Sequence, residues 1–222
     1  MSNLSPSTVA YLFADRFVLT AQPGKTGMKA FGTGAVVVTA ELSAGLVAIS
    51  LWQLRERGVV TLEQYQSKKL GFISTSGVRI TLAGDGEAAG VEKAVLDTLK
   101  TWKKARDQGV SAWDVANMVC RDGKDPNATV IHFAIEEAVA AGCLQRAPQE
   151  VGAVGRLTGR PQAVLQPVPE RLAELKPRAD ELALQWREFR QGAEAEMVKL
   201  LRSTTYDGIQ VRAQRSRDLG DD

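Results

Sequence analysis

Apolar residues dominate one stretch of the chain, Phe31–Leu54, which contains a single charged residue, Glu41. The stretch is long enough to cross a bilayer, but the Ser, Gln and Gly residues within it are more typical of a buried helix in a globular core. We therefore expect a central core helix over Ala35–Arg57. Gly58 is expected to end it, because glycine adopts the left-handed conformation common just after helix C-termini.

A helix, a glycine and a short apolar strand follow one another twice, at Gly45–Glu63 and at Val130–Arg146. After the first copy, residues 70–86 are expected to form a hairpin that turns at Ser76-Gly77, because β-rich runs flank this pair. After the second, Cys143–Ala147 and Ala163–Pro167 are expected to pair around a long loop. Winged-helix modules are also built from helices followed by a strand and a β-hairpin, so the pattern is similar to theirs.

Capping residues and helical periodicity predict the remaining helices. They are Ser5–Arg16, Glu87–Asp107, a helix capped by Ser111, a helix from Pro126 to Gly142, and Glu170–Thr204 with a break at Pro177. The fold class is therefore mainly α with peripheral β-hairpins. We expect a helical core domain with its hairpins over residues 1–167, and a long charged C-terminal helix over 168–204, packed on the core or extending from it. A polar, disordered tail is expected over 205–222.

Composition and charge exclude some functional classes. Hydrophobic residues make up 44% and charged residues 24% of the chain, and the net charge is only +2. An indiscriminate nucleic-acid binder would carry a stronger basic field, so any electrostatic site must be local. Cys120 and Cys143 match no metal-binding spacing, and we expect two buried free thiols in a cytoplasmic protein.

The residues typical of catalysis are sparse. The single histidine, His132, lies in an apolar helix, where a core or flanking role is the usual one. One histidine and two distant cysteines form no metal site. Glu136 and Glu137 are adjacent, so they point about 100° apart on a helix and are expected on a solvated face. The sequence thus predicts a protein that is not an enzyme and needs no metal or cofactor.

Two glycine-rich motifs resemble phosphate-binding loops without completing them. The segment Pro23–Gly27 contains Gly-Lys-Thr, but Leu19 stands where a P-loop needs its first glycine. The segment Gly84–Gly90 follows a strand and opens a helix, as a dinucleotide-binding turn does. Its third glycine comes one residue too late, and no parallel sheet is predicted around it. We interpret it as a turn and a helix start.

The order of elements over Tyr11–Ala147 resembles the Golgi phosphoprotein 3 family and its bacterial relatives. The likeness lies in "FADRFVLTA", then "GLVAISLWQLRERGVVTLE", then "GDGEAAGVEKAVLDTLK", then "AIEEAVAAGCLQR". The resemblance implies a single helical domain with peripheral hairpins. It also implies a non-enzymatic peripheral membrane or adaptor protein that binds phosphatidylinositol 4-phosphate or another anionic lipid. The positions that correspond to the family's headgroup-binding residues do not match, since they are Val38, Val47, Ala128 and Ile131.

The loop of the second hairpin carries the candidate binding residues. Arg156 and Arg160 are the candidate lipid- or phosphate-binding residues, and Val151, Val154 and Leu157 would insert into the membrane. The expected partners are anionic lipid headgroups or partner proteins.

Two alternatives remain open. A winged-helix regulator would bring the same two arginines to DNA, although the helix before Gly142 has two glutamates and no basic residue. A helical assembly module would pair with a partner through Glu181–Leu201.

Overall fold

The central element of the fold is a helix, α2 (Thr39–Glu56), whose residues from Leu42 to Leu54 are almost all buried. Four helices pack around it, α1 (Pro6–Leu12), α3 (Gly90–Thr101), α6 (Pro126–Ala140) and α8 (Ala195–Asp218). Contact on every side explains why its sequence is apolar all round. Two buried serines on α2 satisfy their hydroxyls with nearby acceptors. Ser43 donates to the Asn127 Oδ1 atom at 2.6 Å, with the Ala40 carbonyl at 3.0 Å, and Ser50 donates to the Leu46 carbonyl at 2.8 Å. The predicted core helix is confirmed, although it begins at Thr39, four residues later than expected.

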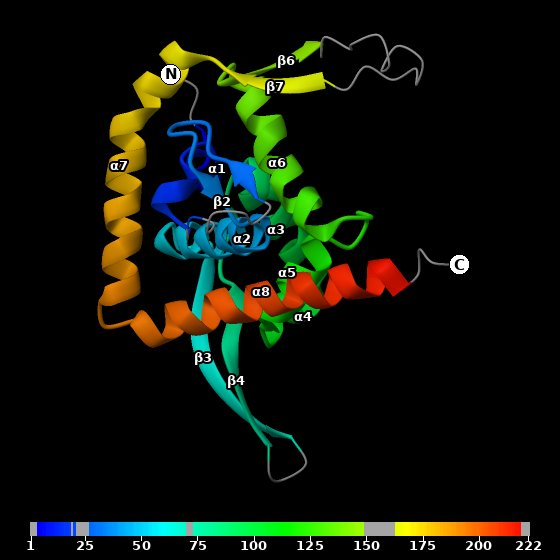
Figure 1. The fold of residues 1–222 in the computed structure, drawn as a ribbon. Coiled ribbons are helices and arrows are strands. Elements are labelled where there is room, and N and C mark those ends of the chain that lie inside the picture. The colour runs from blue at the N-terminus through cyan, green and yellow to red at the C-terminus, as the bar shows by residue number, and fades with distance from the viewer. Residues whose placement is uncertain (1–3, 19, 21–26, 70–72, 149–162, 219–222) are drawn as a thin grey trace.

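The computed structural model describes residues 4–18, 20, 27–69, 73–148 and 163–218. In this part of the chain the fold is mainly helical with small antiparallel sheets, which confirms the predicted fold class (Figure 1). The helices before the C-terminal pair are α1 (Pro6–Leu12), the 3-10 helix η1 (Ala14–Arg16), α3 (Gly90–Thr101), α4 (Lys103–Asp107), α5 (Ala112–Val119) and α6 (Pro126–Ala140).

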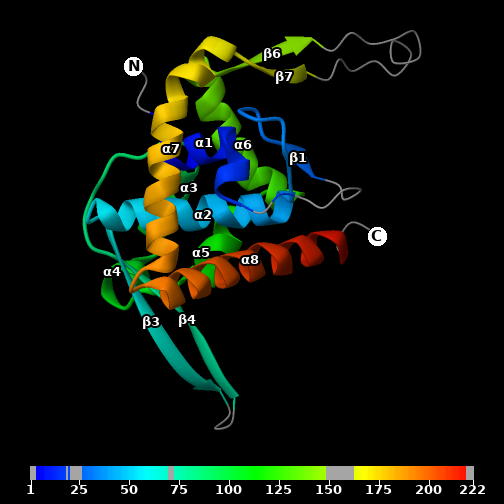
Figure 2. The same ribbon diagram turned by 60° about the vertical axis from the view of Figure 1, so that its left-hand side comes forward.

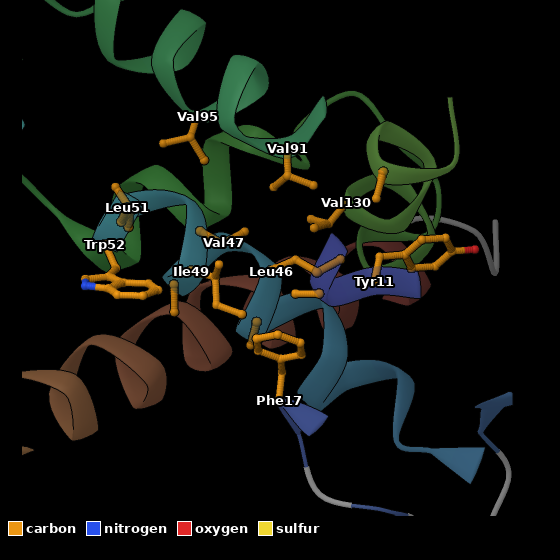
Figure 3. Close-up of a cluster of buried hydrophobic side chains, with 14 of the residues drawn as sticks. Tyr11, Phe17, Leu46, Val47, Ile49, Leu51, Trp52, Val91, Val95 and Val130 are labelled. Carbon is orange, nitrogen blue, oxygen red and sulfur yellow. The ribbon is translucent and has the colours of Figure 1, made fainter. Parts of the chain in front are cut away.

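Figure 3 shows how the core forms around α2. Leu46, Val47 and Ile49 project from α2 between side chains of the surrounding helices. Val91 and Val95 reach this layer from α3, Val130 from α6, and Tyr11 from α1. All of these side chains are at most 1% exposed. Burial of apolar area from every neighbouring helix therefore fixes the position of α2.

The helix–glycine–strand unit occurs twice, as predicted. Helix α2 is followed by Gly58 and β3 (Val60–Lys69), and α6 by Gly142 and β6 (Leu144–Pro148). Gly58 has φ +69° and Gly142 φ +71°, so both adopt the left-handed conformation that ends a helix. Each strand pairs with the next one along the chain, β4 (Ile73–Leu82) or β7 (Ala163–Pro167). The predicted pairing of the second hairpin is thereby confirmed.

The turn predicted at Ser76-Gly77 is wrong. Both residues lie inside β4, where Gly77 pairs with Tyr65 and Ser76 with Gln66. A Cβ atom on Gly77 would lie only 3.0 Å from the Tyr65 hydroxyl oxygen. Glycine at this position lets the Tyr65 ring of the partner strand pack closely against the backbone of β4.

The remaining strands are short. Strand β5 (Val110–Ser111) pairs with β4 and extends the first hairpin to three strands. Strands β1 (Met28–Lys29) and β2 (Val36–Val37) pair with each other. The helix predicted over Glu87–Asp107 is divided at Trp102, whose backbone is extended (φ −104°, ψ 106°) and whose side chain packs against the core.

Two long helices, α7 (Pro169–Gln191) and α8 (Ala195–Asp218), complete the fold. In Figure 1, α7 runs along one side of the body and α8 crosses it. This arrangement corrects three predictions. Pro177 lies within α7, and the chain bends at Gly192 instead. The predicted pairing helix Glu181–Leu201 is therefore two helices, whose buried Trp186 and Leu201 pack in the chain's own core.

The third correction concerns the C-terminal boundary. Residues 205–218, predicted as part of a disordered polar tail, form the second half of α8. Thr205, Ile209 and Ala213 recur every four residues and are at most 7% exposed, so one face of this segment is buried against the core. Most residues between them in the sequence are polar, which is why the sequence alone predicts a solvated tail here.

Candidate functional site

The predicted membrane-binding residues lie outside the described part of the chain. Val151, Val154, Arg156, Leu157 and Arg160 all belong to residues 149–162. The structure describes the base of their hairpin, where β6 and β7 pair from Leu144–Pro167 to Pro148–Ala163. We call this pair of strands the β6–β7 hairpin; residues 149–162 connect them in the sequence.

The β6–β7 hairpin projects from the helical body, at the opposite end of the molecule from the β3–β4 hairpin (Figures 1 and 2). Its strands are largely exposed, and Val164 on β7 is 42% exposed. Among the described residues, only one other large hydrophobic side chain, Leu184, is exposed to a similar degree. An apolar side chain therefore faces solvent one residue from the end of β7 at which the loop joins.

A small polar cluster lies where the β6–β7 hairpin meets α6. Arg146 on β6 forms an ion pair with Glu136 on α6, and the His132 Nδ1 atom lies 3.4 Å from the same carboxylate. The side chains of all three are between 44% and 61% exposed. His132 is thus a surface residue that flanks an ion pair, in line with the flanking role predicted for it.

Glu137, in contrast, does not lie on a solvated face. Its carboxylate accepts hydrogen bonds from the Ser5 backbone amide at 2.5 Å, the Ser5 hydroxyl at 2.6 Å and the Thr8 hydroxyl at 2.6 Å. Ser5 is also the N-cap of α1, as predicted. The Glu137 carboxylate therefore satisfies polar groups at the N-terminus of α1 and ties this helix to α6.

A second carboxylate, that of Glu92, is buried in the first turn of α3 and only 1% exposed. Its Oε2 atom accepts a hydrogen bond from the Arg57 guanidinium at 2.6 Å, whereas its Oε1 atom has no hydrogen-bond partner. Burial raises the pKa of Glu92 to about 7, and the nearby Glu137 carboxylate adds to the increase. Arg57, the Ser7 backbone N–H and Arg178 act in the opposite direction, because each favours the ionised carboxylate.

Glu92 lines a groove of about 540 Å³ formed by the start of α1, the start of α3, the end of α2 and the middle of α7. The Arg178 guanidinium, from α7, donates to the backbone carbonyl of Leu4 at 2.7 Å. Arg57 donates to the backbone carbonyl of Glu87 at 3.1 Å as well as to Glu92. The groove thus brings two guanidinium groups and a buried, half-satisfied carboxylate together.

Two arginines at the end of α2 bind carboxylates from distant parts of the chain. Arg57 binds Glu92, and Arg55 binds the Glu194 carboxylate with both terminal nitrogens, at 2.7 and 2.5 Å. Both partners lie far away in the sequence, so local spacing could not identify them. Glu92 itself did carry a signal, because it shares the buried face of α3 with Val95, Leu96 and Leu99. A carboxylate within an apolar stripe indicates a specific partner.

The described residues offer few groups for other chemistry. Cys120 and Cys143 are free and buried, as predicted, and burial raises the pKa of the Cys120 thiol to about 11. A thiol with a raised pKa is a poor nucleophile at neutral pH. Within the part of the chain that the structure describes, no three His, Cys, Asp or Glu residues are grouped so as to hold a metal ion.

Comparison with known proteins adds no relative: no protein-family model, curated protein or solved structure matches the chain. The resemblance to the Golgi phosphoprotein 3 family therefore stays a prediction that rests on the order of elements.

Proposed function

We propose that this protein is a non-enzymatic adaptor that binds an anionic membrane surface peripherally through the β6–β7 hairpin. The observation that carries the proposal is the exposure of Val164, 42%, on the strand that directly follows the sequence segment with Val151, Val154 and Leu157. An exposed apolar side chain on a projecting pair of strands, followed in the sequence by further apolar residues, is suited to shallow insertion among lipid headgroups.

The charge of the β6–β7 hairpin supports an anionic surface. Residues 144–167 contain Arg146, Arg156 and Arg160 and a single acidic residue, Glu150. Each basic residue near an anionic membrane contributes about 1 kcal/mol, and arginine binds phosphate groups in a bidentate manner. Electrostatic attraction and partial apolar insertion together favour weak, reversible binding that decreases at high salt.

Surface contact is the mode of binding that the helices favour. Within the described residues, no helix has both the length and the apolar character needed to cross a bilayer. The β3–β4 hairpin lies at the other end of the molecule (Figure 1), so it would point away from a membrane bound by the β6–β7 hairpin. It would then be free to contact a partner protein, which is the arrangement that an adaptor requires.

Two features favour the membrane over DNA. Helix α6, which would be the recognition helix, contains no lysine or arginine, so it offers nothing to neutralise phosphates. A winged-helix domain commonly adds a third strand to its wing, whereas here β5 pairs with β4 of the other hairpin.

Co-sedimentation with vesicles tests the proposal. Phosphatidylcholine vesicles with and without phosphatidylserine or phosphatidylinositol 4-phosphate are mixed with the full chain at low and high salt. We expect the protein to pellet with anionic vesicles at low salt only. The double variant Arg156→Glu, Arg160→Glu should abolish pelleting. The same charge change on α7, Lys176→Glu with Arg187→Glu, is the matched control because both side chains are exposed there.

The vesicle experiment has two outcomes that contradict the proposal. Failure of the wild-type protein to bind any anionic vesicle at low salt excludes the membrane function. Equal loss of binding in the hairpin and α7 variants would show that only net charge matters. A salt-sensitive mobility shift with duplex DNA that is lost in the hairpin variant would favour the regulator instead.

A further inference from the structure

A pocket of about 500 Å³ lies where the last turn of α7 meets the first part of α8, beside the first turn of α2 (Figures 1 and 2). It shares no described lining residue with the groove around Glu92 or with the β6–β7 hairpin, so it is a separate site. Its volume lies in the usual range for small-molecule sites. Arg190 in the pocket is exposed, and Arg202 and Tyr206 are half-buried, so a ligand can reach all three side chains.

The Arg190 guanidinium is the starting point of the inference. It lies in the last turn of α7 and forms no hydrogen bond or ion pair with the residues that the structure describes. The charged group that acts on it is Arg202, which has the same sign. Partial burial and the charge of Arg202 lower the pKa of Arg190, and no carboxylate in the described part of the chain offsets them. Because two guanidinium groups that line one pocket repel each other, both stabilise an anion that binds between them.

Arg202, on α8, can contribute to such a site. Its contact with a carboxylate joins its Nη2 atom to the Glu41 Oε2 atom at 3.4 Å, which is longer than the usual 2.7–3.2 Å of an N–H···O hydrogen bond. A guanidinium carries five N–H donors, and this contact uses one of them. Arg202 can therefore keep Glu41 and still donate to a ligand.

The acidic residues of the pocket restrict the charge of the ligand. Glu41, Glu196 and Asp207 also line it, so an anion with two charges, such as a phosphate monoester, would be repelled more strongly than one with a single charge. A carboxylate has one charge, and its planar shape matches the fork of a single guanidinium, which can donate two parallel hydrogen bonds to it. The unpartnered Arg190 therefore suits a carboxylate best.

The pocket also has an apolar part. Val198 lines it and is only 1% exposed, and the half-buried Tyr206 packs against the core. A hydrocarbon group that covers these side chains is itself removed from water, which favours binding. We propose that this pocket binds an organic monocarboxylate, with its carboxylate on Arg190 and Arg202 and its hydrocarbon part on Val198 and Tyr206. This function is separate from membrane binding.

Nuclear magnetic resonance titration of the full, ¹⁵N-labelled chain tests the pocket. The probes are benzoate and hexanoate, each compared with its neutral amide, and phenyl phosphate. We expect at least one carboxylate to cause saturable shifts of backbone amide signals from residues 195–207, and its amide to bind at least tenfold more weakly. Arg190→Gln should weaken binding of the carboxylate at least tenfold. Arg187→Gln, which changes an exposed arginine of the same helix outside the pocket, should leave binding unchanged.

Four outcomes would overturn the proposal. They are the absence of saturable shifts with both carboxylates, equal binding of the amides, equal binding by the Arg190→Gln and Arg187→Gln variants, and tighter binding of phenyl phosphate than of either carboxylate. Arg190→Gln should fold normally, because Arg190 is exposed and has no described hydrogen bond to lose. Vesicle binding by this variant should equal that of the wild type, so failure of this inference leaves the membrane proposal intact.

Discussion

The indole rings of Trp52, on α2, and Trp186, on α7, pack with their centroids 5.3 Å apart. Phe189 stacks on Trp52 at 5.5 Å, and the Arg55 guanidinium lies 5.7 Å from the centre of the Phe189 ring. Arg55 also holds Glu194, just beyond the bend between α7 and α8. This cluster fixes the C-terminal pair of helices against the central helix, so we expect the whole chain to unfold as one unit.

Trp186→Ala should therefore lower the free energy of unfolding by about 3–5 kcal/mol, the usual cost of removing a buried aromatic side chain. Leu184→Ala on the same helix is the control, because Leu184 is 51% exposed and should change stability by less than about 0.5 kcal/mol. Urea unfolding monitored by far-UV circular dichroism, which reports on the helices, measures the free energy of unfolding of both variants. Similar values for the two variants would mean that α7 does not dock on α2.

The adjacent carboxylates of α6 allow a comparison within one helix. Glu137→Ala removes the acceptor for three donors at the start of α1, two of them on buried Ser5, and should cost about 1–3 kcal/mol. Glu136→Ala removes only exposed contacts with Arg146 and His132, worth about 0–1 kcal/mol. Thermal unfolding of the two variants should rank them in this order, and the reverse order would contradict the capping role of Glu137.

Glu92 should make stability depend on pH. Its pKa in the folded chain is about 7, above the ordinary value of 4.5, so the folded state holds a proton that the unfolded state releases between these values. The free energy of unfolding should accordingly fall as the pH rises from about 4.5 to 7. At about 1.4 kcal/mol per pKa unit, the loss is about 3 kcal/mol.

Urea unfolding across this pH range checks the sign. The decrease should become shallower in Glu92→Gln, which has no proton to lose. Glu87→Gln, an exposed neighbour in the same groove, should retain the wild-type slope. A wild-type slope in Glu92→Gln would assign the pH dependence to another group.

Gly58 and Gly142 should respond alike to substitution. Both have positive φ, and nothing lies within 4 Å of a Cβ atom added at either position. The cost of Gly→Ala is thus one of backbone conformation only, about 1–2 kcal/mol at each site. Gly→Asn should cost less, because asparagine tolerates this conformation. Chemical denaturation of the four variants tests the equivalence of the two units, and a large difference between Gly58→Ala and Gly142→Ala would contradict it.

Local sequence was sufficient to predict the elements whose signals are short-range. The all-apolar run that became α2, the Ser5 and Ser111 caps and the stop at Gly58 each depend on residues within a turn or two of one another. For this reason the mainly helical class with hairpins, and the repeated helix–glycine–strand unit, followed from the sequence. The loop arginines Arg156 and Arg160 also come from sequence alone, and vesicle binding is the test of their role.

Tertiary structure decided whatever depends on a distant partner. The sequence around Gly77 predicts a turn, whereas in the structure Gly77 lies within a strand and pairs with Tyr65. The C-terminal half of α8 is polar in sequence, and its buried face is recognisable only because that face packs against the core. The groove also depends on packing, since Arg57 lies just after α2, Glu92 on α3 and Arg178 on α7, and these residues meet only when the three helices pack. Spacing along a chain records which side chains share a face, whereas the partner across that face, and the burial that shifts the Glu92 pKa, arise only from packing.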